Sequence, residues 1–432
     1  MADKVLIITY YWPPSGGSGV QRWLKFVKYL PSFGWHPFVF TPENPSFAVR
    51  DESLLNDVPK EATVITFPIW EPYDAFLKLS SLVDSKRSVT PTAMVSGKPK
   101  TVFQKISTWV RGNLLVPDPR VFWVRPSVRY LNDFLKQEQI NTIITTGPPH
   151  SIHLIGYRLK KKNPSIKWLA DFRDPWSEWG FLDSLKVGPI ARSFHQKLES
   201  KVLNTADTIV TITPFYVRQF ESLSRRKVSL VTNGFDEDDF KGLSFMPTEK
   251  FVIRHVGTVN EKCDPRPFIN AVALAAAASE GFRKNTIVNF VGEVHPDFKD
   301  FVQRSPAAAA LVTFSPPVSH KALIACYGQS NLLLLVLTGY KDAEGYMPGK
   351  LFEYLATGLP IIATGPENGD AASLMREAGI GSMIDGTHVS RMKDVLLTHF
   401  LNWKTSLPVP PGSAGHKYSR RAATKQLVEL LQ

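Results

Sequence analysis

The stretch "GYMPGKLFEYLATGLPIIAT" (residues 345–364) joins a loop containing glycine and proline to a helix and then to an apolar run typical of a buried strand. Gly349, Lys350 and Leu351 stand where this helix begins. The start of a helix offers backbone N–H groups and the positive end of the helix dipole, and Lys350 adds a cation, so the pattern predicts a phosphate site. Glu353 lies one turn further in, where a carboxylate can accept both hydroxyls of a ribose. The simpler alternatives are a solvated lysine and an exposed helical acid.

Strand-like runs alternate with helical segments along the whole chain, in two series that meet near residue 231. This alternation predicts an α/β protein of two Rossmann-like, doubly wound domains facing a cleft. The predicted domains are 1–230 and 231–415, followed by an amphipathic helix over 416–432. The first series has predicted strands at 4–12, 36–42, 62–68, 140–147, 166–176 and 206–213, with a helix over 20–34. In the second series, a strand ends in the turn within 228–240, a helix covers 266–280, and strands follow at 250–257, 286–292, 310–317, 331–338 and 359–365.

The composition is that of a globular protein, because 43% of the 432 residues are hydrophobic and 11% are aromatic. Two cysteines, Cys263 and Cys326, make neither a disulfide framework nor a metal quartet. No apolar run reaches the roughly 18 residues that span a bilayer, and the first residues lack the layout of a secretory signal. We therefore expect a cytoplasmic protein.

The formal net charge of +12 predicts an anionic partner, and one segment holds much of this excess. Residues 75–115 contain seven lysines or arginines against one acid, Asp84, interleaved with leucine, phenylalanine and tryptophan. Such a basic and apolar insertion is typical of a surface that lies on a membrane, although a solvated insertion with local packing fits as well. We expect no nucleic-acid partner, because the basic residues are concentrated in this insertion and not spread along a face with aromatic stacking platforms.

Two other site types are excluded by spacing. "GGSGVQR" resembles a dinucleotide fingerprint, but Arg22 stands where the third glycine should be, and the loop lacks the Gly-Lys-Ser/Thr ending of a P-loop. His150 and His153 could share a metal, but no third ligand stands beside them. We expect no metal site and no required cofactor.

Six stretches, in order along nearly the full chain, resemble the retaining glycosyltransferases of family 4, which have the GT-B fold of two Rossmann-like domains and include many bacterial polysaccharide enzymes. They are "PPSGGSGVQR" (13–22), "TTGPPHSIHLIG" (145–156), "ADFRDPW" (170–176), "TNGFD" (232–236), "HVGTVNEKCDPRPF" (255–268) and "PGKLFEYLATGLPII" (348–362). The resemblance implies a nucleoside-diphosphate sugar as donor, and it implies that the final helix crosses back to the first domain.

In this family a glutamate at the position of Glu353 binds the donor ribose. A second glutamate, separated from the first by seven intervening residues, holds the donor sugar in the family, but here that position is Gly345. Glu344 lies one residue further back and is the candidate replacement, with Asp342 as a rival.

The resemblance also suggests which groups bind the donor diphosphate. An arginine and a lysine near "HVGTVNEKCDPRPF" do so in similar enzymes, and the available cations here are Lys262 and Arg266. Gly16 and Gly17 are expected to meet the same phosphates from the first domain, because glycine lets a ligand approach the backbone closely.

Related enzymes often carry a histidine after the strand that ends in "ADFRDPW", where this chain has Arg173 between Asp171 and Asp174. An arginine holds neighbouring aspartates ionised, so either could orient or deprotonate an acceptor hydroxyl. His150, in the "GPPHS" turn, is another candidate. Equally, the arginine and the aspartates could be structural.

Retention in this fold is thought to need no covalent intermediate, so catalysis would consist mainly of stabilising the charge of the leaving diphosphate. We expect a glycosyltransferase that transfers a sugar to a saccharide or lipid-linked acceptor in surface polysaccharide biosynthesis, at the inner face of the membrane. Two alternatives stay open: a sugar-nucleotide epimerase on the same fold, and a non-catalytic sugar-nucleotide binding module.

Overall fold

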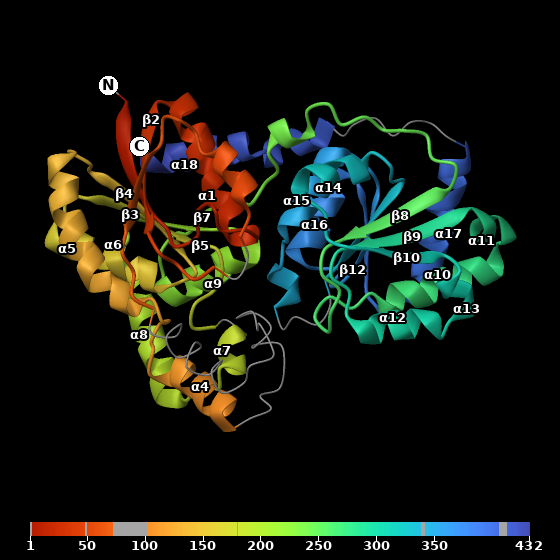
Figure 1. The fold of residues 1–432 in the computed structure, drawn as a ribbon, viewed down its shortest axis with the longest axis horizontal. Coiled ribbons are helices and arrows are strands. Elements are labelled where there is room, and N and C mark those ends of the chain that lie inside the picture. Colours follow the sequence, from red (N-terminus) through yellow and green to blue (C-terminus); the bar gives the residue numbers. More distant parts are fainter. Residues whose placement is uncertain (1, 48–49, 72–101, 179, 338–341, 406–412) are drawn as a thin grey trace. The chain divides into compact units, whose positions relative to one another are not determined.

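The chain forms two compact α/β units, which Figure 1 shows in a computed structural model. Unit 1 is Met1–Thr232 together with Ala423–Gln432, and unit 2 is Asn233–Ala422. The structure describes residues 2–47, 50–71, 102–178, 180–337, 342–405 and 413–432. Among these residues, no helix is both long enough and apolar enough to cross a bilayer.

Unit 1 is built on a parallel sheet with the strand order β3-β2-β1-β4-β5-β6-β7. Its central strands β1 and β4 are rich in aliphatic side chains and mostly buried, as in parallel sheets between helices, whereas the edge strand β3 is largely exposed. The strands of the described chain are β1 (Asp3–Ile8), β2 (Trp35–Pro42), β3 (Thr63–Phe67), β4 (Thr142–Gly147), β5 (Lys167–Phe172), β6 (Thr208–Thr211) and β7 (Ser229–Leu230).

Helices cover both faces of this sheet. One core cluster includes Trp123, Ile155 and Phe220, and the other includes Trp23 and Leu427. The second cluster therefore joins the first helix of the chain to the last. The helices are α1 (Ser18–Tyr29), α4 (Val102–Asn113), α5 (Val121–Gln137), α6 (Ser151–Lys162), α7 (Phe181–Ser184), α8 (Pro189–Thr205), α9 (Pro214–Ser224) and α18 (Arg420–Leu431), with 3-10 turns η1 (Leu30–Phe33) and η2 (Glu52–Asp57).

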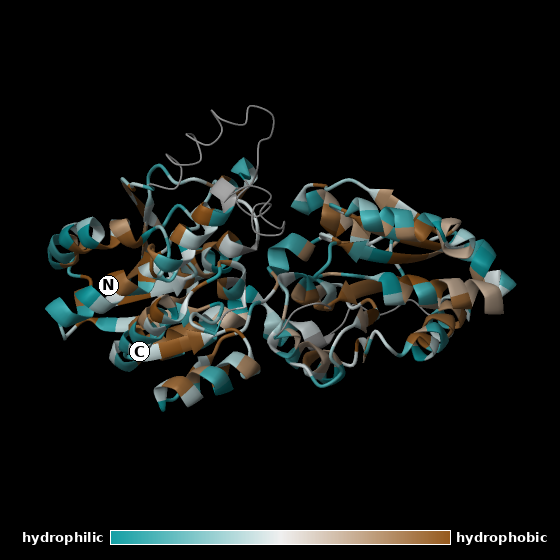
Figure 2. Ribbon diagram, turned by 90° about the horizontal axis from the view of Figure 1, so that it is seen from below, coloured by the Kyte–Doolittle hydropathy of each residue, from teal (hydrophilic) through white to brown (hydrophobic). Residues whose placement is uncertain are grey.

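Unit 2 repeats this plan with the strand order β10-β9-β8-β11-β12-β13. Figure 2 shows apolar strands between helices in both units. The strands are β8 (Phe251–Val256), β9 (Thr286–Val291), β10 (Val312–Ser315), β11 (Leu332–Val336), β12 (Ile361–Thr364) and β13 (Gly381–Ile384). The helices are α10 (Arg266–Ala278), α11 (Glu280–Asn285), α12 (Pro296–Gln303), α13 (Pro306–Ala309), α14 (His320–Tyr327), α15 (Gly349–Thr357), α16 (Asp370–Ala378) and α17 (Val389–Thr405), with 3-10 turns η3 (Glu237–Phe240), η4 (Ala343–Gly345) and η5 (Ser413–Tyr418).

Each sheet has a point where the strand order reverses direction. In unit 1 this switch point lies between β1 and β4, and in unit 2 it lies between β8 and β11. The loops that leave the carboxyl ends of the two central strands diverge there, and open α/β sheets bind their ligands at such a point. Most of the residues predicted from the sequence to form a site follow β1, β4 or the neighbouring β5 in unit 1, and β8 or β11 in unit 2.

The predicted alternation of strands and helices is confirmed, but several element boundaries were wrong. β1 ends at Ile8 and not at residue 12, β7 contains only Ser229–Leu230, and β13 was not predicted. The last helix begins at Arg420 and not at residue 416, because Ser419 caps it by accepting a hydrogen bond from the Ala422 N–H at 3.1 Å. Of the predicted insertion 75–115, residues 75–101 lie outside the described residues.

Candidate functional site

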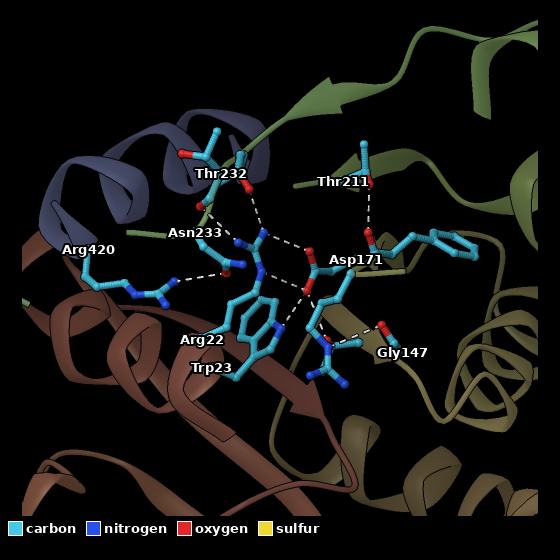
Figure 3. Close-up of polar contacts among 12 residues, drawn as sticks. Arg22, Trp23, Gly147, Asp171, Thr211, Thr232, Asn233 and Arg420 are labelled. Atoms are coloured by element: carbon cyan, nitrogen blue, oxygen red, sulfur yellow. Dashed lines mark hydrogen bonds and ion pairs between the residues drawn. The ribbon is translucent and has the colours of Figure 1, made fainter. Parts of the chain in front are cut away.

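At the carboxyl end of β5, Asp171 is fully buried and paired with Arg22 of α1 (Figure 3). The Arg22 guanidinium donates to both carboxylate oxygens, at 2.9 and 3.2 Å, and the indole N–H of Trp23 donates to Oδ2 at 2.7 Å. The Thr146 hydroxyl, at the end of β4, also donates to Oδ2, at 3.0 Å. The carboxylate of Asp171 is therefore enclosed by α1, β4 and β5.

This environment sets the charge of Asp171. Burial alone would raise the pKa of the carboxyl, but Arg22, assisted by Trp23, holds the pKa below its usual range. The arginine expected beside Asp171 was Arg173, and the structure replaces it by Arg22. Arg22 also donates to the backbone carbonyls of Val231 and Thr232, so it ties α1 to the end of the β7 segment. A catalytic role for Asp171 stays a prediction, and these contacts favour a structural one.

The Arg173 side chain binds backbone carbonyl groups of two neighbouring segments. Its guanidinium donates to the carbonyl oxygens of Gly147, Pro148 and Gly19, the last at 2.9 Å. It thereby joins the loop after β4 to the first turn of α1, on both sides of the switch point. Asp174 follows it, and burial raises the pKa of the Asp174 carboxyl although Arg173 acts in the opposite direction.

His150 is 5% exposed and lies within an aromatic stack. Its ring is nearly parallel to that of Trp176, with the ring centroids 5.0 Å apart. The Trp176 indole N–H donates to Nδ1 of His195 at 3.0 Å, and the Glu199 carboxylate accepts from the N–H groups of Trp176 and Ser177. Burial lowers the pKa of His150 well below its usual value, so this imidazole is neutral near pH 7.

Gly16 and Gly17 lie in the loop between β1 and α1. Gly17 precedes the first residue of α1 with a φ of +87°, a conformation that favours glycine, and no atom lies within 4 Å of the place its Cβ would occupy. No side chain caps this helix start. A side chain on Gly17 would therefore stand in open space, and the contact of Gly16 and Gly17 with a phosphate stays a prediction.

In unit 2, Lys350 reaches from the start of α15 to the end of β8. Its ammonium group donates to the carbonyl oxygen of Val256 at 2.8 Å, and burial lowers its pKa. Gly257 has a φ of +121°, and a Cβ there would lie 2.6 Å from the Lys350 nitrogen. A Cβ at Gly292 would in turn collide with the Gly257 carbonyl oxygen. Glycines therefore leave room for the lysine at the switch point.

Glu353 lies one turn beyond Lys350 on α15, with its side chain 26% exposed. One carboxylate oxygen accepts a hydrogen bond at 2.9 Å from the hydroxyl of Tyr327, whose side chain is fully buried. The other oxygen lies 3.4 Å from Nε2 of His320, at the start of α14. The carboxylate is thus held in place and still reaches solvent.

The remaining predicted donor residues surround the same strand ends. Gly349 and Leu351 form the first turn of α15, which no side chain caps, and no atom lies within 4 Å of a Cβ placed on Gly349. Glu344 is exposed within η4, in the segment that leads from β11 to α15.

The two predicted cations, Lys262 and Arg266, are both exposed; Lys262 lies in the segment between β8 and α10, and Arg266 is the first residue of α10. Arg266 pairs with Asp264 at 3.2 Å and lies over the ring of Phe301. The roles of both cations stay predictions.

Sequence reasoning missed the residues that hold the predicted ones in place. Arg22 was noted only because it stands where a dinucleotide fingerprint would have its third glycine, and its pairing with Asp171 had no signal in the sequence. Tyr327, His320 and Glu199 had no such signal, because their partners are distant in sequence.

No family model matches the chain, and no curated protein sequence matches it. Solved structures match it over nearly its full length. Sucrose-phosphate synthase from Thermosynechococcus elongatus has a TM-score of 0.59 at 14% identity, covering 99% of this chain and 98% of that one. WaaG, a glycosyltransferase involved in lipopolysaccharide biosynthesis, has a TM-score of 0.54 at 14% identity, covering 99% of both chains. A putative UDP-N-acetylglucosamine 2-epimerase from Listeria monocytogenes has a TM-score of 0.54 at 11% identity, covering 100% of this chain and 96% of that one. The predicted GT-B fold class, two Rossmann-like α/β domains, is therefore confirmed.

Proposed function

We propose that this GT-B protein is a glycosyltransferase that uses a nucleoside-diphosphate sugar as donor. The observation that carries the proposal is the arrangement at the switch point of unit 2. An uncapped helix start, a lysine ammonium and a fixed, partly exposed carboxylate lie together there, on Gly349, Lys350 and Glu353. They match the phosphates and the ribose of a nucleotide, since phosphates bind helix starts and cations, and a carboxylate accepts hydrogen bonds from hydroxyls.

The chemistry would consist of stabilising the departing diphosphate. The first turn of α15 and Lys350 would take up the charge that develops as the bond to the sugar breaks, and Lys262 and Arg266 would assist from the segment after β8. Glu353 would hold the ribose, and Glu344 the sugar. Gly16 and Gly17 would provide backbone contacts to the phosphates. In this mechanism the acceptor attacks the face that the diphosphate leaves, so the anomeric configuration is retained, and the reaction requires neither a metal nor a cofactor.

The acceptor would be a saccharide or a lipid-linked sugar in surface polysaccharide biosynthesis, bound by unit 1 at the inner face of the membrane. The similarity of fold to WaaG, a glycosyltransferase involved in lipopolysaccharide biosynthesis, supports this setting. Arg173, Asp174 and His150 flank the unit 1 switch point and are the candidates for orienting the acceptor.

An epimerase is the second candidate, because a putative sugar-nucleotide 2-epimerase shares the fold. Both functions need the donor site, and only the transferase needs an acceptor. Incubating the protein with its donor alone distinguishes the two functions. An epimerase would convert the sugar of the donor without an acceptor, whereas a transferase would need the acceptor to form a disaccharide or glycolipid.

A donor-binding screen tests the proposal. The melting temperature of the full chain would be measured with UDP-, GDP-, ADP- and dTDP-sugars, for the wild type and for Glu353→Ala, with exposed Glu429→Ala of α18 as the matched control. A donor at 100 times its dissociation constant should stabilise the fold by about 2.7 kcal/mol. We expect stabilisation by one nucleotide, lost in Glu353→Ala and kept in the control. No stabilisation by any of the four would contradict the proposal.

A further inference from the structure

Unit 1 exposes large apolar side chains around α4 and the start of α8. Ile190 and Leu114 are the two most exposed large apolar side chains in the described part of the chain, at 79% and 65%. Soluble proteins rarely gather such side chains without a partner. We call this set the apolar platform: Ile106, Trp109, Leu114, Ile190 and Phe194, each at least 49% exposed.

The platform is fixed by contacts between α4 and the turn before α8. The Asn113 side chain accepts a hydrogen bond from the Gly188 N–H at 2.8 Å and donates to the Lys186 carbonyl at 3.2 Å. The backbone packs closely here, since a Cβ at Gly112 would lie 2.5 Å from the carbonyl oxygen of Leu185. In Figure 1, α4, α7 and α8 lie together at one end of unit 1. The apolar side chains are therefore presented by ordered, connected elements.

The charges around the platform are mostly positive. Lys105, Lys186 and Lys197 are exposed beside it, and the Lys197 ammonium lies 5.9 Å from the centre of the Phe194 ring. Residues 102–114 contain no acid, and Asp183, the one acid between 180 and 198, pairs with Arg192 at 2.6 Å. Apolar side chains that enter the acyl boundary, ringed by lysines, complement an anionic bilayer surface.

We propose that the apolar platform docks unit 1 onto an anionic lipid surface. The proposal assigns membrane association to a defined surface of unit 1. It rests on the proposed function only in assuming that the acceptor is reached at a membrane. Ile190 and Phe194, the platform residues on α8, lie outside the basic segment 75–115 for which the sequence predicted a membrane surface.

Vesicle co-sedimentation of the full chain tests this inference. Binding to phosphatidylcholine vesicles that contain phosphatidylglycerol would be compared with binding to phosphatidylcholine alone. The double variant Ile190→Ser/Phe194→Ser should weaken binding to the anionic vesicles at least about tenfold, because burying each side chain is favourable. Lys186→Glu and Lys197→Glu should each weaken it about fivefold or more and reduce its dependence on salt. The matched controls are Leu401→Ser and Lys404→Glu on α17 of unit 2, both at exposed positions.

Four outcomes would overturn the inference. The first two are a lack of binding to anionic vesicles and an equal loss of binding in the α17 controls. The third is a dimer of the wild type that the Ile190→Ser/Phe194→Ser variant dissociates. The fourth is a fall in the melting temperature of that variant, which would show that the chain itself covers the platform. Donor binding in the same variants should match the wild type, so failure of the docking surface is distinguishable from failure of the donor site.

Discussion

The two switch points occupy equivalent places in two similar sheets, but their polar groups are used differently. In unit 1, Asp171 is enclosed by Arg22, Trp23 and Thr146, so its charge is neutralised within the protein. In unit 2, Lys350 donates to a backbone carbonyl, and Glu353 keeps a carboxylate partly open to solvent. The contacts around Asp171 therefore favour a structural role for this carboxylate, whereas the partly exposed carboxylate of Glu353 fits the proposed donor site.

The largest expected effect is in unit 1. Asp171→Asn should lower the free energy of unfolding by about 3–5 kcal/mol, because it leaves the buried Arg22 guanidinium without its counter-charge. Denaturant unfolding of the full chain measures this. Asp183→Asn, in an exposed pair, is the control and should change stability by less than about 1 kcal/mol. A small loss in Asp171→Asn would show that the pair is not the structural anchor described above.

The second effect concerns pH. Burial raises the pKa of Glu199 to about 7 from an ordinary value of 4.5, although hydrogen bonds from Ser177 and Trp176 oppose the shift. The folded protein therefore holds this proton more tightly than the unfolded chain, so the Glu199 contribution to stability is complete below about pH 4.5 and is lost as the pH rises to 7.

Glu199→Gln resembles the protonated acid, so its free energy of unfolding should rise relative to that of the wild type by about 2–3 kcal/mol between pH 5 and pH 8. Unfolding curves of both proteins at each pH measure the difference. A difference that does not vary with pH would mean that Glu199 is ionised throughout this range.

The third effect is on ligand binding alone. Lys350→Met should weaken donor binding about ten- to a hundredfold, the loss expected for hydrogen bonds to a charged group, as calorimetric titration would measure. Without donor, its unfolding free energy should stay equal to that of the wild type or rise, because a buried ammonium is removed. If Lys350→Met were as destabilising as Asp171→Asn, the contrast between the two switch points would be wrong.

The smallest effect is that of a residue which positions another. Tyr327→Phe removes the hydroxyl that holds Glu353, and it should weaken donor binding about two- to tenfold. Nucleotides that lack the 2′- and 3′-hydroxyls should bind Tyr327→Phe and the wild type almost equally, since the interaction with Glu353 is then absent from both. Tyr354→Phe, on the same helix as Glu353, is the control. Equal weakening for both kinds of nucleotide would assign Tyr327 a purely structural role.

The sequence predicted the fold because apolar runs alternate with helical segments, a signal that is local. For the same reason it placed Gly17 in the loop after the first strand, and Lys350 and Glu353 at the start of a helix. It could not predict that Arg22 pairs with Asp171, because 149 residues separate them and Arg173 was the nearer cation. Nor could it predict the edge strand β13, whose four residues, "GSMI", lack the longer apolar run of the central strands.

Hydrogen exchange of the full chain, with and without the nucleoside diphosphate found in the screen, tests the central claim most directly. The account predicts that the ligand protects the backbone amides of Gly349 and Lys350 at the start of α15, while amides around Asp171 are already protected without it. Protection confined to unit 1, or a complete lack of protection at α15, would contradict the account.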